Sequence, residues 1–329
     1  MIRVAVIGGG ANGEREVSLE SAAAAAAALN PARYDVVRLT CEPDGGWLLD
    51  GRPATFAAAV AALASCGVAL PLIHGAGGED GTLAALCDLA GVPYVGCGVT
   101  ASAIGMDKHA TKLLAASVGI RTARGTLLSR GAAVSGWPST WQGPVVVKPV
   151  DAGSSVGVSW VTEEGGLAPA LDEAFAWSKR ALVEEHIDGR EIDIAVFREG
   201  DGLVVSAPLE INADKHWDFA EKYRSTRTLE EMFTIPAPLG AAEAAGLAEQ
   251  ARRMYTALGA AGVARFDFFL DGSGWLLNEV NTIPGMTSLS QVPLVYQAVG
   301  IEYPELLDRL IAEALDLAAE HWSRETPTP

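Results

Sequence analysis

Short apolar runs alternate with amphipathic stretches over the first hundred residues. The runs have the length of buried strands, and each is followed by a stretch whose apolar positions have helical spacing. The predicted strands are 2–7, 34–39 and 68–73, and the predicted helices are 17–29, 56–66 and 82–90. Strands that alternate with helices predict a parallel sheet covered on both faces. We therefore expect an α/β domain with a Rossmann-like parallel sheet.

After Gly98 the pattern changes, because strands begin to follow strands. Two β-branched runs flank a glycine-rich loop, which predicts an antiparallel α+β arrangement. The expected elements are helix 108–118, strands 145–148 and 158–161, further strands from 181, helix 241–258, a hairpin over 263–281 and helix 304–319. We expect three units, at 1–100, 101–183 and 184–329, with a polar lid near 212–231.

Composition agrees with a globular enzyme. The length of 329 residues predicts about two domains, with one or three also compatible. Hydrophobic residues make up 49% and charged residues 20%, which excludes a disordered chain. The net charge of −17 disfavours a nucleic-acid partner, because phosphate backbones are repelled. We expect a cytoplasmic protein, since neither a signal peptide nor an 18-residue apolar span is evident.

The glycines of the first loop match the dinucleotide fingerprint at Gly8, Gly10 and Gly13. An NAD site also needs an acid about 20 residues further on. Glu42 lies 29 residues past Gly13, which is too far. We favour a tight loop that presents Glu14 and a helix N-terminus suited to an anionic ligand.

Two further loops carry candidate chemistry. The segment 74–82 follows the third predicted strand, where α/β sheets bind ligands, and His74 would offer a donor or a positive charge to a carboxylate. The segment 148–157 is not a Walker motif, because it lacks G-K-[ST] and a strand follows it. Its glycines and hydroxyls can still fold over phosphates. Lys148 ends a buried strand, an unfavourable place for an ammonium without a partner.

The predicted hairpin carries acidic residues in register. A three-residue loop at 272–274, with Gly274 left-handed, would pair Asp271 with Trp275. Asp267 would then face Glu279, and Arg265 would face Asn281. Two carboxylates and an amide oxygen this close repel one another unless a hard cation lies between them. The sequence therefore predicts a divalent metal site here.

These motifs together resemble the D-alanine–D-alanine ligases of the ATP-grasp superfamily. The resemblance covers about residues 2–318 in order, and the combination is highly specific. It is carried by the segments Glu14–Ser18, His74–Gly81, Met106–Lys108, Lys148–Gly157, Glu221–Tyr223, Arg265–Asp267 and Asn278–Ser288. The resemblance implies an ATP-grasp fold of three domains, with ATP between the antiparallel sheets of the last two.

The resemblance also implies a reaction and a set of nucleotide contacts. ATP would phosphorylate the carboxylate of one D-alanine, and the amine of a second would displace phosphate, giving a precursor for peptidoglycan. The magnesium ligands would be Asp267, Glu279 and Asn281, holding two Mg²⁺ ions or Mn²⁺ in their place. The ATP contacts would be Lys108, Lys148, Ser154, Ser155 and Lys222 at the phosphates, and Glu184 and Glu191 at adenine and ribose.

The remaining implied roles concern the amino acids. Arg265 and the backbone N–H of Gly285 would stabilise the oxyanion of the tetrahedral intermediate. Glu14 would bind the ammonium of the first D-alanine, with His74 near its carboxylate, and Ser290 would bind the second carboxylate. Glu14, Ser154 and Tyr223 would form a hydrogen-bonded trio that closes the lid. The family also leads us to expect a homodimer.

The second substrate is the point at which alternatives stay open. Leu289 stands where some family members carry histidine, and the lid resembles vancomycin-resistance ligases that use D-serine or D-lactate. Another ATP-grasp amide ligase of antibiotic biosynthesis is a further alternative. A non-catalytic binding module would not need Asp267, Glu279 and Arg265 together. Tyr223, a neutral phenol, favours amide formation with D-alanine.

Overall fold

The computed structural model describes residues 1–131, 143–212 and 227–325. The first unit is a five-stranded sheet in the order β4-β3-β2-β1-β5. Its centre is parallel, as predicted, and consists of β1 (Ile2–Gly9), β2 (Tyr34–Cys41) and β5 (Val68–Pro71). The sequence analysis missed the antiparallel extension β3 (Trp47–Leu49) and β4 (Arg52–Ala54), because strands of three residues give no clear alternation.

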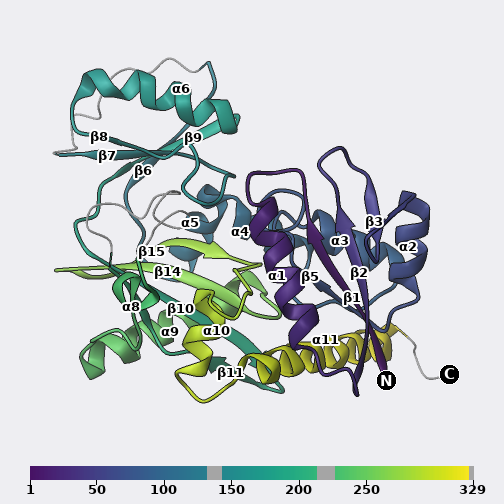
Figure 1. Ribbon diagram of the computed structural model, residues 1–329. Helices are drawn as coiled ribbons and strands as arrows, with labels where there is room; N and C mark the ends of the chain where they lie inside the picture. Colours follow the sequence, from purple (N-terminus) through teal and green to yellow (C-terminus); the bar gives the residue numbers. More distant parts are fainter. Residues whose placement is uncertain (132–142, 213–226, 326–329) are drawn as a thin grey trace.

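The two faces of this sheet are covered by different helices (Figure 1). Val4 and Val6 pack with α1 (Arg15–Ala28) and α11 (Tyr303–Glu325). The alternate residues Ala5 and Ile7 pack with α2 (Phe56–Ala64) and α3 (Thr82–Ala90). This alternation follows from the period of two along a strand. The loops after β1 and β5 lie at one edge of the sheet because the two strands are parallel.

The central unit is a four-stranded antiparallel sheet in the order β6-β9-β7-β8. The strands are β6 (Gly125–Ser129), β9 (Arg180–Glu185), β7 (Val145–Pro149) and β8 (Ser159–Val161). A short 3₁₀ helix, η1 (Glu164–Gly166), leads into α6 (Leu167–Trp177), which covers one face and closes a separate core. Figure 1 shows the other side of this sheet turned towards the C-terminal sheet.

The C-terminal unit is built on a six-stranded antiparallel sheet, β13-β12-β10-β14-β15, with β11 paired to β10. Its strands are β10 (Arg190–Glu199), β11 (Gly202–Val205), β12 (Leu209–Ile211), β13 (Phe233–Thr234), β14 (Ala264–Asp271) and β15 (Gly274–Asn281). The remaining helices of the described residues are α4 (Val99–Met106), α5 (Lys108–Ser117), α8 (Leu229–Met232), α9 (Ala241–Leu258) and α10 (Gln291–Gln297). Helices α4, α5 and α9 cover the apolar face, where Phe266 and Phe268 are fully buried.

The β14–β15 hairpin corrects the predicted turn. Asp271 pairs with Gly274, so the turn has two residues, not three, although Gly274 has the predicted positive φ of 110°. A β-bulge after Asp267 restores the register, so that Asp267 still faces Glu279 and Arg265 still faces Asn281. The pairing at the site was therefore predicted correctly, while the turn was wrong.

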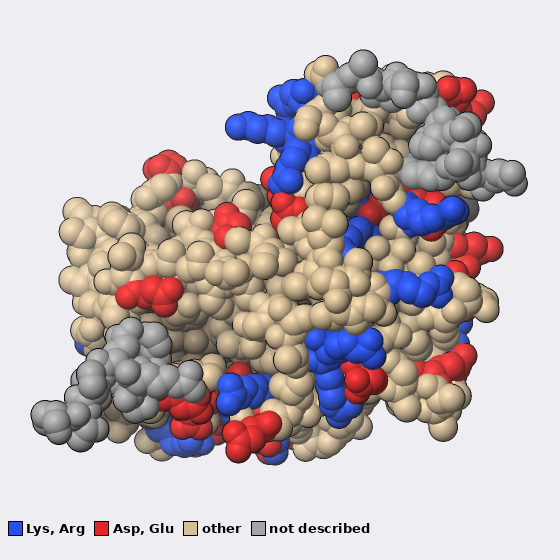
Figure 2. Space-filling model, turned by 180° about the vertical axis from the view of Figure 1, so that it is seen from behind, with Lys and Arg blue, Asp and Glu red and all other residues tan. Residues whose placement is uncertain are grey.

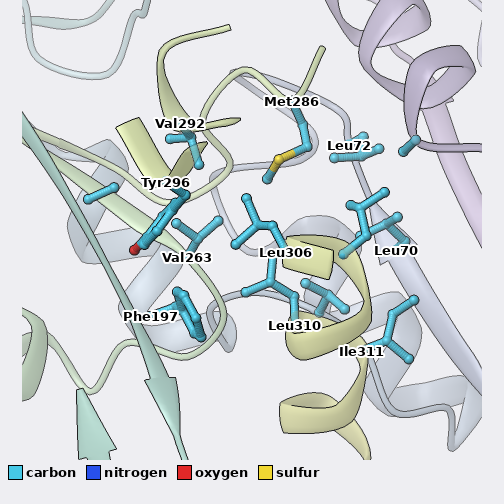
Figure 3. Close-up of a cluster of buried hydrophobic side chains, with 14 of the residues drawn as sticks. Leu70, Leu72, Phe197, Val263, Met286, Val292, Tyr296, Leu306, Leu310 and Ile311 are labelled. Carbon is cyan, nitrogen blue, oxygen red and sulfur yellow. The ribbon is translucent and has the colours of Figure 1, made fainter. Parts of the chain in front are cut away.

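The N-terminal and C-terminal units share one core (Figure 3). Leu70 and Leu72 of the first unit lie near Leu306 and Leu310 of α11, and Phe197 of β10 meets the ring of Tyr296 edge-on at 5.2 Å. This shared core fixes the loop after β15 beside the loops after β1 and β5.

The described residues carry free thiols and a surface of mixed charge. The four cysteines are free thiols. Among the described residues, basic and acidic side chains are interspersed over the face in Figure 2, and no continuous basic surface crosses it. None of the described helices combines the length and apolar character that a membrane span requires.

Candidate active site

Two adjoining cavities lie where the three units meet. The first, of about 280 Å³, lies between the loops after β1, β5 and β15 and the polar face of the C-terminal sheet. The second, of about 430 Å³, lies between the central and C-terminal sheets. Glu279, Glu191 and Ile211 line both cavities. A group bound in one cavity can therefore meet a group bound in the other beside Glu279.

The structure brings the predicted site residues together as far as it describes them. The first cavity is lined by Glu14, His74, Ser154, Glu191, Arg265, Asp267, Glu279, Asn281, Gly285 and Ser290. The second is lined by Lys108, Lys148, Ser155, Glu184, Glu191 and Glu279. Lys222 and Tyr223 lie outside the described residues.

Carboxylates form a row across three neighbouring strands. Asp193 of β10 pairs with Asp267 of β14, which pairs with Glu279 of β15. The sequence analysis missed Asp193, which is buried two positions after Glu191 and therefore on the same face of its strand. That spacing of two was the available signal.

Arg265 lies in the next row and binds these acids. Its Nε and Nη2 donate to the two oxygens of Asp267 at 2.7 and 2.8 Å, and its Nε lies 3.6 Å from Asp193. Burial disfavours the guanidinium charge, but Asp267, Asp193 and Glu279 raise the pKa of Arg265 well above its ordinary value. The guanidinium is therefore a fixed positive charge at the cavity wall, and two of its five N–H groups are used by Asp267.

Asp267 and Glu279 suit a divalent cation that also binds a ligand. Asn281 donates to Asp267 at 3.0 Å, so amide and carboxylate oxygens are in reach of one ion once the amide turns. Within residues 1–131, 143–212 and 227–325, no three His, Cys, Asp or Glu side chains form a metal site by themselves. Magnesium is commonly held by one or two carboxylates with substrate phosphates. The donor set fits such an ion.

Lysines form the wall of the second cavity. Lys108 donates to the carbonyl of Ala152 at 2.7 Å and lies 3.3 Å from Glu279. Lys148 lies 2.7 Å from Glu184 and donates to Asn278, the residue at the bulge, at 3.1 Å. Buried ammonium groups need partners of this kind, and the two lysines place cationic groups in this cavity.

A third lysine, Lys112, was missed by the sequence analysis. It lies one helical turn after Lys108 on α5 and 2.9 Å from Glu184. Burial lowers the pKa of Lys112. Burial alone would raise the pKa of Glu184, but Lys148 and Lys112 together lower it. Glu184 is therefore an ionised carboxylate, 3% exposed, between two cations. The spacing of four from Lys108 was the available signal.

Replacing Lys112 by methionine should lower the free energy of unfolding by about 3 kcal/mol. This is the lower end of the range for breaking a buried ion pair, because Glu184 keeps Lys148. Urea unfolding measures the change. The double variant Lys112→Met with Glu184→Gln should not recover the loss, because the buried Lys148 then loses its carboxylate partner. A loss below about 1 kcal/mol, as for exposed pairs, would contradict the expectation.

Glu14 lies between two glycines. Its Oε1 accepts a hydrogen bond from Ser154. A Cβ atom at Gly75 would lie 2.2 Å from Glu14 Oε2, and one at Gly153 would lie 2.9 Å from the same oxygen. Ser154 and Ser155 both adopt positive φ, at 52° and 58°, which is unfavourable outside glycine. The glycine loop thus reaches the N-terminal unit by direct contact with Glu14.

Gly285 and Ser290 lie at the far end of the first cavity. Among the described residues, the N–H of Gly285 has no hydrogen-bond partner, and Gly285 lines the cavity. A Cβ at Gly285 would lie 3.0 Å from Ser290 Oγ. That hydroxyl also accepts the N–H of Thr287 at 3.0 Å. Both groups therefore present polar atoms to one part of the cavity.

Comparison with known proteins shows which family the chain belongs to. Family models described as the D-ala D-ala ligase N-terminus and C-terminus match residues 3–59 with 52–97 and residues 123–312. The chain belongs to the D-alanine–D-alanine ligase family. It is 37% identical over 350 residues to a D-alanine–D-alanine ligase of Corynebacterium aurimucosum, covering 95% of this chain and 98% of that protein. The resemblance inferred from the motifs is confirmed.

Solved structures show the same fold. A D-alanine–D-alanine ligase from Bacillus anthracis, complexed with ATP, has a TM-score of 0.78 at 27% identity and covers 97% of this chain and 99% of that one. A D-Ala:D-Ser ligase from Enterococcus faecalis has a TM-score of 0.78 at 30% identity. The match covers 95% of this chain and 99% of that one. The ATP-grasp fold is thus confirmed, and the fold is common to ligases with different second substrates.

Proposed function

We propose that the chain is an ATP-dependent ligase that joins two D-alanines into D-alanyl-D-alanine for peptidoglycan synthesis. The observation that carries this proposal is the junction of the two cavities at Glu279. One cavity is lined by lysines suited to nucleotide phosphates, and the other by Glu14, Arg265 and Ser290, suited to amino acids. The γ-phosphate and a substrate carboxylate would meet at the junction.

The chemistry follows from the charges on the two walls. A carboxylate is a poor electrophile, and transfer of the γ-phosphoryl group gives an acyl phosphate with a good leaving group. The amine of the second amino acid then attacks the acyl carbon, and phosphate leaves. Two anions must approach in the first step, so positive charge is required. Lys108 and Lys148 provide it at the phosphates, and Arg265 provides it at the carboxylate.

Asp267, Glu279 and Asn281 would hold two Mg²⁺ ions, and Mn²⁺ could replace Mg²⁺. The metal would supply positive charge to the nucleotide phosphates. The support is the donor chemistry of these three side chains in one register. The ATP-bound relative supports use of the nucleotide itself.

The remaining assignments rest on the family resemblance and on position in the cavities. Glu14 would bind the ammonium of the first D-alanine, and Ser290 the carboxylate of the second. Arg265 and the N–H of Gly285 would stabilise the oxyanion. Glu184 and Glu191 would bind adenine and ribose, and Ser154 and Ser155 would cover the phosphates. Lys222 and Tyr223, a closing lid and a homodimer stay predictions, and so does a cytoplasmic location.

D-serine is the second candidate for the incoming amino acid. The observation that favours it is Leu289, which lines the first cavity and is 62% exposed; a D-Ala:D-Ser ligase also shares the fold. A leucine offers no charge that would select a substrate carboxylate or reject an ammonium. Discrimination would then fall to the lid, where Tyr223 is neutral at pH 7. We expect D-alanine to be preferred and D-serine to be the best substitute.

The test begins with phosphate release from Mg-ATP in the presence of D-alanine, L-alanine or no amino acid. Release that depends on D-alanine supports the proposed function, and release without it refutes it. Equal D-alanine, D-serine and D-lactate at pH 7, with products identified by mass, then separates the second substrates. We expect mostly D-alanyl-D-alanine. Predominant D-alanyl-D-lactate would contradict the specificity argument, and predominant D-alanyl-D-serine would identify a resistance-type ligase.

A further inference from the structure

His74 makes two side-chain contacts within the protein. Its ring is buried, at 4% exposure, with Nδ1 2.7 Å from the carbonyl oxygen of Ile283 and Nε2 2.9 Å from Ser21 Oγ. A carbonyl oxygen only accepts, so Nδ1 must carry a proton. Burial lowers the pKa of His74, which favours the neutral ring. The histidine is therefore a donor to Ile283.

Glu79 binds the other side of the same residue. Its Oε1 accepts the N–H of Ile283 at 2.9 Å, and its Oε2 accepts the N–H of Gly75 at 2.8 Å. Both backbone groups of Ile283 are thus bound by side chains of the loop after β5. We call His74, Glu79 and Ile283 the Ile283 clamp.

A third contact lies beyond Gly285. Ser21 Oγ accepts the N–H of Met286 at 3.3 Å, so its own proton is free to be donated to Nε2 of His74. This hydroxyl therefore favours the tautomer that the clamp needs. Residues on both sides of Gly285 are held by the N-terminal unit, while the N–H of Gly285 itself points to no described partner.

We propose that His74 and Glu79 are positioning residues that aim the N–H of Gly285 at the oxyanion of the reaction. The proposal rests on the proposed function, which gives that N–H its role. His74 then acts through Ile283, instead of contacting the carboxylate of the first amino acid as the family resemblance implies. A donor that is misplaced by about 1 Å loses much of its effect on the transition state, on the order of 10²-fold.

Two replacements of His74 separate these roles. Asparagine places an N–H close to the Nδ1 position, and glutamine places one close to Nε2. If the clamp is correct, His74→Asn should keep kcat within about fivefold of the wild type, while His74→Gln and His74→Ala should lower it about 10²-fold. KM for ATP should change less than twofold. A direct contact from Nε2 to the substrate predicts the reverse order for Asn and Gln, with a raised KM for D-alanine.

Glu79 gives an independent test. Glu79→Gln keeps one acceptor but turns an NH₂ towards the second N–H, so kcat should fall and the affinity for a phosphinate analogue of the tetrahedral intermediate should fall with it. Asp80→Asn is the matched control, because Asp80 binds Gly77 and Thr82 within the same loop and does not contact Ile283. This control should keep kcat and analogue affinity within twofold.

The geometry can be checked without turnover. In protein labelled with ¹⁵N-isoleucine, the amide proton of Ile283 should move upfield in Glu79→Ala and stay in place in Asp80→Asn. An unchanged Ile283 signal, or full kcat in His74→Gln and Glu79→Gln, overturns the proposal. If the wild type makes no dipeptide from D-alanine, the proposed function fails and with it the catalytic role of the clamp, whereas the amide shift still decides whether the clamp exists.

Discussion

Glu279→Gln should reduce ligation by at least about 10³-fold, because it removes a charge worth several kcal/mol at the junction of the two cavities. Glu279 lies 3.3 Å from Lys108 and faces Asp267 across the hairpin. The neutral amide would bind a divalent cation less well and would leave Lys108 without its acid. Mg-ATP affinity by calorimetry should fall, while D-alanine affinity changes little.

Asp271→Asn is the control for this substitution. Asp271 lies at the turn end of the same hairpin and contacts Ser273, away from both cavities. It should keep full activity. Unchanged phosphate release by Glu279→Gln at low Mg²⁺ would refute the assignment of Glu279 as a metal ligand.

Arg265→Lys should lower kcat by about 10²–10³-fold, the usual effect of losing a donor to an oxyanion. Lysine keeps the charge near Asp267 but cannot use two N–H groups for that carboxylate and still offer the planar fork to the substrate. KM for ATP should change little, because Arg265 lines the first cavity, whereas Lys108 and Lys148 line the second. Steady-state kinetics with varied ATP and D-alanine measure both effects.

Arg265→Ala is a weaker test, since it leaves the buried Asp267 and Asp193 without their cation. Breaking such a pair costs about 3–5 kcal/mol of stability. The lysine variant separates catalysis from folding, and its thermal unfolding should stay close to that of the wild type. Retention of more than half the rate by Arg265→Lys would show that the guanidinium is structural.

The sequence predicted secondary structure well where the apolar residues of a segment recur with one constant period. Helix α9 has the predicted bounds, Ala241–Leu258, because buried apolar residues recur every three to four positions from Leu247 to Leu258 and Gly259 ends the helix. The pairing of Asp267 with Glu279 was predicted from alternation, even though the turn was assigned one residue too many. The bulge compensates for the shorter turn, and no local pattern reveals a bulge in advance.

Contacts between distant segments were not predictable in this way. Ile283 is 209 residues from His74, and no spacing links them. The spacing along the chain pointed to Lys112 and Asp193. Their partners, Glu184 and Arg265, come close to them only in the folded chain, so the spacing alone could not assign them a role. Sequence motifs thus located the residues around the reaction and left their supporting contacts to the structure.

Among the described residues, the core of the central sheet joins no other core. Its cluster there consists of residues between 128 and 183, including Val147, Leu171 and Val183. By contrast, the shared core of β5, β10 and α11 binds the two outer units together. Local opening follows such boundaries, so amides of β6–β9 should exchange with deuterium through an opening of lower free energy than those of β1 or β10. The glycine loop at 148–157 would open and close together with this smaller unit. The strands that carry Arg265, Asp267 and Asp193 would stay protected from exchange.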